Sequence, residues 1–131
     1  MTNKLDVVID ELGMAIAGRD INRLRNIYDD KVVVWHSATG QAQTKEENCA
    51  LLAKLFTISA ELGYHSIQRH AIEGGVVQQH CLKGRFNDGT EMPALHACMV
   101  IKVEGGKIIR IDEYFDFQTF APVWEKLLGE S

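Results

Sequence analysis

A carboxylate on an apolar strand face is the feature of this sequence that points most directly to chemistry. Glu113 lies in residues 107–116, where alternating side-chain character predicts a β-strand with Ile109, Ile111 and Phe115 on the face of Glu113. An ionised carboxylate is costly to bury without a partner, so an acid here is a candidate for proton transfer or for binding a ligand. The alternative is a structural glutamate that reaches solvent or bonds to a neighbour.

The glycine pair Gly105-Gly106 predicts a two-residue turn, which sets the register of the strand before it. Residues directly opposite one another in an antiparallel pair point to the same face. With this register, Ala94, His96 and Cys98 share the face of Glu113. His96 is therefore a candidate proton donor or acceptor, whereas Cys98 would pack beside it as a small apolar residue.

A second hairpin brings another histidine toward the same face. If Asn87-Asp88-Gly89 form a three-residue loop, His80 lies opposite His96 and Leu82 faces inward, whereas a two-residue loop turns His80 to the other face. We favour the longer loop, which together with the next turn brings Arg69 near His80. With the carboxylate, these side chains form a polar cluster on an apolar face, which is typical of a small-molecule site. A single strand histidine is more often structural.

The elements that must position these side chains follow from hydrophobic spacing. Apolar residues three and four apart predict helices, and apolar residues two apart predict strands. Asp20, and Thr44 with Glu47, are expected to cap the second and third helices. Helices are expected over residues 5–16, 21–28, 44–62 and 117–128. Strands are expected over residues 32–35, 64–73, 76–86, 91–103 and 107–115, with residues 37–44 as a loop.

Short glycine-containing turns join the last four strands, so they are expected to form an antiparallel meander with helices on one face. The opposite face of residues 91–103 is also apolar and would need a second cover. A homodimer through this convex face of the sheet is therefore expected. The residues of this face are Leu95, Ala97, Met99, Ile101 and Val103.

Composition excludes several classes of function. Of the 131 residues, 46% are hydrophobic and 24% are charged, and the net charge of -4 gives no basic surface for nucleic acid. No apolar run reaches membrane-spanning length, and no signal peptide is expected. Cys49, Cys81 and Cys98 form no disulfide framework, so we expect reduced thiols and a cytoplasmic location. No ligand spacing supports a metal, and no glycine-rich phosphate loop supports a cofactor.

The chain resembles the nuclear transport factor 2-like superfamily, in its SnoaL-like and ketosteroid-isomerase-like branches, over nearly its whole length. The resemblance is carried by Ala17-Gly18-Arg19-Asp20, by Tyr28-Asp29-Asp30 before Val32-Val33-Val34-Trp35-His36, and by Gly106-Lys107-Ile108 leading to Glu113-Tyr114-Phe115-Asp116. It implies an α+β fold, a cone-shaped α+β barrel whose curved, mainly antiparallel sheet wraps around helices, with residues 1–131 as a single SnoaL-like domain. This scaffold hosts isomerases, cyclases, hydrolases, dehydratases and non-catalytic binders.

The resemblance also suggests site residues. In an alignment with ketosteroid isomerases, the general-base aspartate falls at His36, the oxyanion-hole aspartate falls near His96, and the oxyanion-hole tyrosine falls near Leu12, so none of the three is kept. In limonene epoxide hydrolases, Glu113 takes the place of one catalytic aspartate, and the other two members of the set fall near His80 and Leu82. A pocket of histidine and glutamate is most similar to the SnoaL-type cyclases.

Together these features predict a SnoaL-like protein that binds a small, largely apolar or partly polar organic molecule and performs cofactor-free acid/base chemistry. The reaction would be isomerisation, cyclisation, hydration or dehydration, or an epoxide-hydrolase-like reaction. Glu113 would be the principal acid/base, with His96, His80 and His36 as further catalytic groups. The expected ligand-binding residues are Trp35, Leu12, Arg69, Leu82, Ala94, Cys98 and Phe115. The alternatives are a non-catalytic ligand-binding domain and a dimerisation domain whose aromatic side chains fill the cone.

Overall fold

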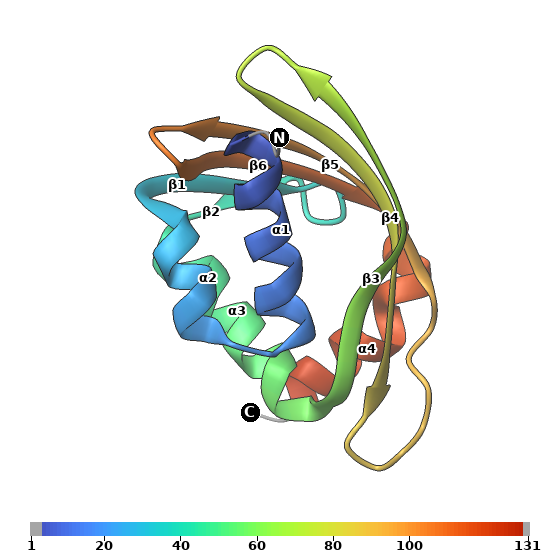
Figure 1. The fold of residues 1–131 in the computed structure, drawn as a ribbon. Coiled ribbons are helices and arrows are strands. Elements are labelled where there is room, and N and C mark those ends of the chain that lie inside the picture. Colours follow the sequence, from blue (N-terminus) through green and yellow to red (C-terminus); the bar gives the residue numbers. More distant parts are fainter. Residues whose placement is uncertain (1–3, 130–131) are drawn as a thin grey trace.

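A strongly curved six-stranded sheet wraps around helices in the computed structural model, which describes residues 4–129 (Figure 1). The strand order is β2-β1-β6-β5-β4-β3, and the sheet does not close on itself. The helices are α1 (Lys4–Ala17), α2 (Ile21–Ile27), α3 (Lys45–Ile58) and α4 (Phe117–Gly129). The strands are β1 (Tyr28–His36), β2 (Gln41–Gln43), β3 (Ser59–Ile72), β4 (Gly75–Phe86), β5 (Leu95–Glu104) and β6 (Lys107–Phe115). The predicted α+β fold, with a curved and mainly antiparallel sheet around helices, is confirmed.

Local signals placed the helix starts correctly. The Asp20 side chain accepts a hydrogen bond from the backbone N–H of Arg23, and Thr44 and Glu47 form the reciprocal capping box. The predicted end of the third helix is wrong, because α3 ends at Ile58 and the next residue already pairs with β4. The residues up to 62 therefore belong to β3, where sheet hydrogen bonds replace the helical ones that their apolar spacing had suggested.

The last four strands form the predicted antiparallel meander, but its register differs by one residue from the prediction. The turn at Gly105-Gly106 forms as expected, and an irregularity between Lys102 and Val103 then shifts the pairing of β5 with β6. Met99 consequently lies opposite Glu113, in the place predicted for its neighbour in the chain. Because side chains alternate across a strand, this one-residue shift exchanges the two faces of β5.

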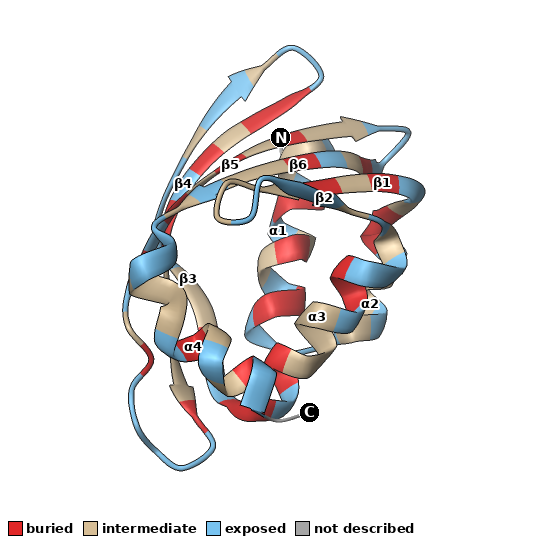
Figure 2. Ribbon diagram, turned by 180° about the vertical axis from the view of Figure 1, so that it is seen from behind, coloured by how far each residue is buried: buried red, intermediate tan, exposed pale blue. Residues whose placement is uncertain are grey.

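The apolar stripe of β5 lies inside the molecule. Leu95, Ala97, Met99 and Ile101 are all buried, and Met99 and Ile101 pack in the same core as the inner face of α1. Figure 2 shows the buried segments where the helices face the curved sheet. The stripe therefore provides no convex surface for a partner, and the prediction of a homodimer loses this basis.

A parallel pair of strands completes the sheet. β1 lies beside β6, with His36 next to Glu113, and β2 forms from part of the segment expected to be a loop. This pairing joins the beginning of the sheet to the end of the meander and sets the position of the site. Within residues 4–129, no helix is long and apolar enough to cross a membrane.

Candidate functional site

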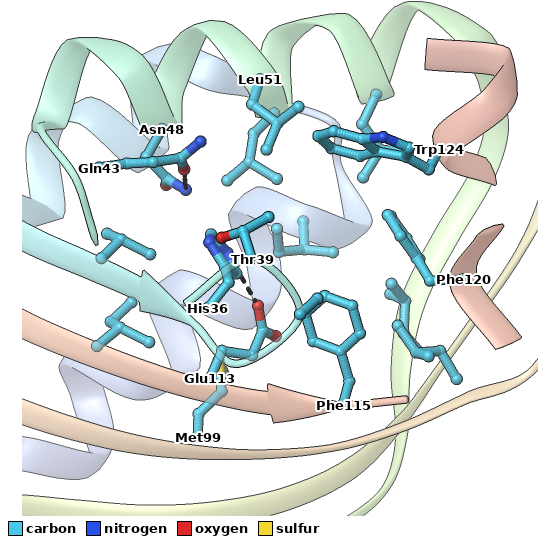
Figure 3. A pocket seen from close by; sticks show the side chains of 18 of the residues that line it. His36, Thr39, Gln43, Asn48, Leu51, Met99, Glu113, Phe115, Phe120 and Trp124 are labelled. Carbon is cyan, nitrogen blue, oxygen red and sulfur yellow. Dashed lines mark hydrogen bonds and ion pairs between the residues drawn. The ribbon is translucent and has the colours of Figure 1, made fainter. Parts of the chain in front are cut away.

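A cavity of about 120 Å³ lies between the concave face of the sheet and helices α1, α3 and α4. Most of its lining is aliphatic or aromatic, and the aromatic side chains of Phe115, Phe120 and Trp124 gather at one end (Figure 3). The polar or partly polar side chains of the lining are Tyr28, His36, Thr39, Gln43, Asn48, Tyr64 and Glu113. A largely apolar cavity with a few polar groups is the usual form of a small-molecule site.

Glu113 and His36 face each other in this cavity. The Glu113 Oε1 and His36 Nε2 atoms are 3.3 Å apart, and the two side chains are 21% and 15% exposed. The contact follows from the parallel pairing of β1 with β6, which makes the two residues Cα partners. The pair combines a carboxylate that can accept a proton with an imidazole that can donate or accept one.

Three polar side chains form a chain of hydrogen bonds at another part of the wall. The Tyr28 hydroxyl donates to Asn48 Oδ1 at 2.7 Å, and Asn48 Nδ2 donates to Gln43 Oε1 at 2.9 Å. Burial raises the pKa of Tyr28 well above its ordinary value, with smaller contributions from nearby negative charge. Sequence reasoning missed all three residues. The available signal was Asn48, a polar residue three and seven positions before Leu51 and Leu55 on the apolar face of a helix.

His80 faces inward and is buried, but it does not line the cavity. Its ring stacks on that of Tyr64, with centroids 3.9 Å apart, and its Nδ1 atom is 3.0 Å from Gln78 Nε2. Burial lowers the pKa of His80, and the charge of Glu113 opposes this shift. His80 Nε2 has no hydrogen-bond partner among the described residues. His80 thus supports the ring of Tyr64, which does line the cavity.

Arg69 also faces inward without reaching the cavity. Its Nε atom donates to Gln78 Oε1 at 2.8 Å, and its Nη1 atom is 2.7 Å from the carboxylate of Asp10 on α1. An arginine can only donate hydrogen bonds, so the Gln78 amide must present its nitrogen to His80. His80 Nδ1 is therefore an acceptor, and the neutral ring carries its proton on Nε2.

Four predicted site residues lie elsewhere. The prediction that His96 and Cys98 share the face of Glu113 is wrong, because the register shift turns both to the convex face, where His96 is exposed. Ala94 is exposed just before β5 and lies outside the cavity. Trp35 does not line the mouth either, because it neighbours His36 on a strand and points to the opposite face, where it packs edge-on against Tyr114.

Leu12, Leu82 and Phe115 line the cavity, so the structure brings them together with Glu113 and His36. Their roles in binding are proposals. Phe120 and Trp124 line the cavity, whereas Phe56 packs in the hydrophobic core. In the part of the chain that the structure describes, no three histidine, cysteine, aspartate or glutamate side chains are grouped so as to hold a metal ion.

Comparison with known proteins agrees with this architecture. A family model described as SnoaL-like domain matches residues 10–111, which is most of the chain. The chain therefore belongs to the SnoaL-like domain family, and the predicted membership of the nuclear transport factor 2-like superfamily is confirmed. A search of curated proteins found no match.

Similar solved structures share this fold. One is a hypothetical protein with a ketosteroid isomerase-like fold from Catenulispora acidiphila DSM 44928, in complex with trimethylamine (TM-score 0.73, 14% identity, covering 86% of this chain and 87% of that one). Another is TerC co-crystallised with polyporic acid (TM-score 0.77, 17% identity, covering 94% of this chain and 99% of that one). A third is an LEH-like epoxide hydrolase from M. tuberculosis (TM-score 0.68, 16% identity, covering 98% of this chain and 97% of that one). At these identities the likeness is one of fold.

Proposed function

We propose that this protein binds a small, largely apolar organic molecule in the cavity and catalyses cofactor-free proton transfer on it. The observation that carries the proposal is the Glu113–His36 pair, 3.3 Å apart in a cavity that is otherwise mostly apolar. Low polarity around the pair strengthens its electrostatic effect on a bound molecule. The complexes of similar folds with trimethylamine and polyporic acid support a small organic ligand.

The chemistry follows from the two groups. The Glu113 carboxylate removes a proton from carbon next to a carbonyl, and the electron pair of the broken C–H bond moves onto the carbonyl oxygen. The proton then returns to a different atom, which gives isomerisation, or the carbanion attacks a second carbonyl, which gives cyclisation. His36 holds the carboxylate in position or delivers the returning proton. In dehydration the enolate expels hydroxide from the β-carbon, and this hydroxide takes up a proton from His36 or Glu113 to leave as water; hydration is the reverse of these steps.

Exchange of hydrogen for deuterium tests this step without knowledge of the natural substrate. Cyclic enones and aryl ketones are incubated with the protein in D₂O, and loss of the signal from hydrogens next to the carbonyl is followed by NMR. Glu113→Gln keeps the shape of the side chain and removes the base, so the rate should fall by about 10²–10⁴-fold. Glu104→Gln, at an exposed position beside a hairpin turn, is the matched control and should exchange at the wild-type rate. Equal rates for wild type and Glu113→Gln on every compound would refute the proposal.

The second candidate is a binding domain without chemistry. It is favoured by the contact between His36 and Glu113, because two groups paired with each other can orient a ligand without transferring a proton to it. A binder returns its ligand unchanged and without deuterium after long incubation. The exchange experiment therefore separates the two candidates.

A homodimer through the convex face and a cytoplasmic location stay as proposals. The convex face carries Tyr114, which is 48% exposed and packs on Trp35, beside the exposed His96. Light scattering after gel filtration measures the mass in solution, and Tyr114→Lys should lower it to that of a monomer if this face is the interface. Free cysteines support a reducing compartment, which fractionation of expressing cells would test.

A further inference from the structure

The chain of hydrogen bonds through Tyr28, Asn48 and Gln43 has a fixed direction. Tyr28 and Asn48 are only 3% and 2% exposed, so water does not replace their partners. Burial raises the pKa of Tyr28, so the phenol keeps its proton, and Asn48 Oδ1 is the one acceptor it contacts within residues 4–129. A buried donor without an acceptor is costly. Asn48 must therefore turn its oxygen to Tyr28 and its nitrogen away from it.

This direction decides which groups remain for a ligand. Asn48 Nδ2 uses one hydrogen on Gln43 Oε1 and keeps a second, and Gln43 Nε2 makes no hydrogen bond with the described residues. Both amides line the cavity, and Figure 3 shows them together on one side of it. This chain of hydrogen bonds, called the amide relay below, thus offers the N–H groups of Asn48 and Gln43 to the cavity, while the two amide oxygens already accept hydrogen bonds.

We propose that Asn48 and Gln43 form a subsite for the carbonyl oxygen of an uncharged ligand and so set the orientation of that ligand. The proposal rests on the proposed function for the presence of a ligand in the cavity. The donors are neutral, and the Glu113 carboxylate in the same cavity disfavours an anion. The nearby Lys45 ammonium is engaged by Asp30 and by the backbone oxygen of Tyr28, so its charge is balanced outside the cavity.

The rest of the cavity determines what the carbonyl is attached to. Phe115, Phe120 and Trp124 form the far end, and in Figure 3 the His36–Glu113 pair lies between them and the amides. A cavity of about 120 Å³ is of the same order as the roughly 150 Å³ cavity that holds benzene in an engineered protein. The ligand class is thus a ketone on a single ring, with the ring among the aromatic side chains and the carbon next to the carbonyl near Glu113.

Two probes that differ in the carbonyl group test the subsite. Acetophenone and ethylbenzene are titrated into the full ¹⁵N-labelled chain, and Kd is obtained from NMR shifts. A change in cavity shape alters the Kd values of both probes, so their ratio reports mainly on the carbonyl group. Asn48→Leu should raise the ratio of acetophenone Kd to ethylbenzene Kd by about twofold to tenfold, as expected for one lost neutral hydrogen bond. The double variant Tyr28→Phe/Asn48→Leu leaves no buried hydroxyl without an acceptor. It should therefore stay folded even if Asn48→Leu alone does not, and its Kd ratio can still be measured.

The control and the contrary outcomes are defined in the same titrations. Leu51→Met changes the cavity wall without changing a donor, so its ratio should equal that of wild type. In wild type, acetophenone should shift the side-chain N–H signals of Asn48 and Gln43, and ethylbenzene should not. An unchanged ratio in the double variant, unshifted amide signals, or no binding of either probe would each overturn the proposal.

The outcome is separable from that of the proposed function. Deuterium exchange that depends on Glu113, together with an unchanged Kd ratio, shows that only the subsite is wrong. A changed Kd ratio without exchange that depends on Glu113 shows that the subsite binds a carbonyl in a protein that performs no proton transfer.

Discussion

Replacing Tyr28 and Asn48, separately and together, measures whether their buried side chains are paired as the structure places them. Tyr28→Phe leaves Asn48 Oδ1 without its donor at 2.7 Å, and Asn48→Leu leaves the Tyr28 hydroxyl without its acceptor. An unpaired buried polar group costs about 1–3 kcal/mol of folding free energy, so each single variant should lose about that much. Removal of both partners in favour of apolar groups of similar shape is nearly neutral. The free energy lost in the double variant should therefore be smaller than the sum of the two single losses by about 2–6 kcal/mol.

Urea unfolding followed by circular dichroism gives these free energies, and thermal unfolding checks them. For a chain of this size, 1 kcal/mol corresponds to roughly 3–5 °C in Tm, so the single variants should melt roughly 3–15 °C below wild type. Tyr114→Phe removes a hydroxyl from an exposed side chain and is the matched control, with no expected change. If the losses of unfolding free energy in the two single variants simply add in the double variant, the Tyr28 and Asn48 side chains are not paired. The direction inferred for the amide relay would then be wrong as well.

Two further predictions concern a buried histidine and a crowded glycine. Burial lowers the pKa of His80 in the folded state, so the unfolded chain binds a proton on this histidine more readily than the folded chain does. His80 should therefore leave the unfolding free energy unchanged above about pH 6.5 and should lower it as the pH falls below that value. In urea titrations between pH 7.5 and 5.5, His80→Phe should show a smaller loss than wild type, and an equal slope would contradict a neutral His80. A Cβ atom at Gly75 would overlap the backbone oxygen of Ile101, so Gly75→Ala should cost at least about 3 kcal/mol. Gly74→Ala, where a Cβ meets nothing but φ is +74°, should cost about 1–2 kcal/mol in the same urea assay, and similar losses for both would argue against the crowding.

The inward facing of Glu113 was predictable because it depends on the alternation of a single strand. The same is true of the helix caps, which depend on residues three apart. His96 and Cys98 depended on the pairing of two strands, and one irregularity beside the turn reversed their facing. A register predicted from the turn is extrapolated along the strand, so a bulge beside the turn shifts every pair that follows it.

A better signal for the facing of β5 was present in the sequence. Leu95, Ala97, Met99 and Ile101 form an unbroken apolar set, whereas the other face contains His96 and a lysine. Burial of apolar area has a larger effect on stability than an ideal turn register, so the more apolar face belongs in the core. Had the faces of β5 been chosen by apolar content, neither the histidine of the site nor the convex stripe would have been misplaced.

The contact between His36 and Glu113 could not be derived from either strand alone, because β1 and β6 pair in parallel across most of the chain length. Ser37 fixes the register of this pair. Its N–H donates to the Glu113 backbone oxygen at 2.9 Å, and its hydroxyl accepts a hydrogen bond from the Phe115 N–H at 3.2 Å. A slip of one residue would turn either His36 or Glu113 to the convex face. The His36–Glu113 pair therefore depends on a small polar residue that does not itself line the cavity, and it is assembled only when β1, from the first third of the chain, pairs with β6 near its end.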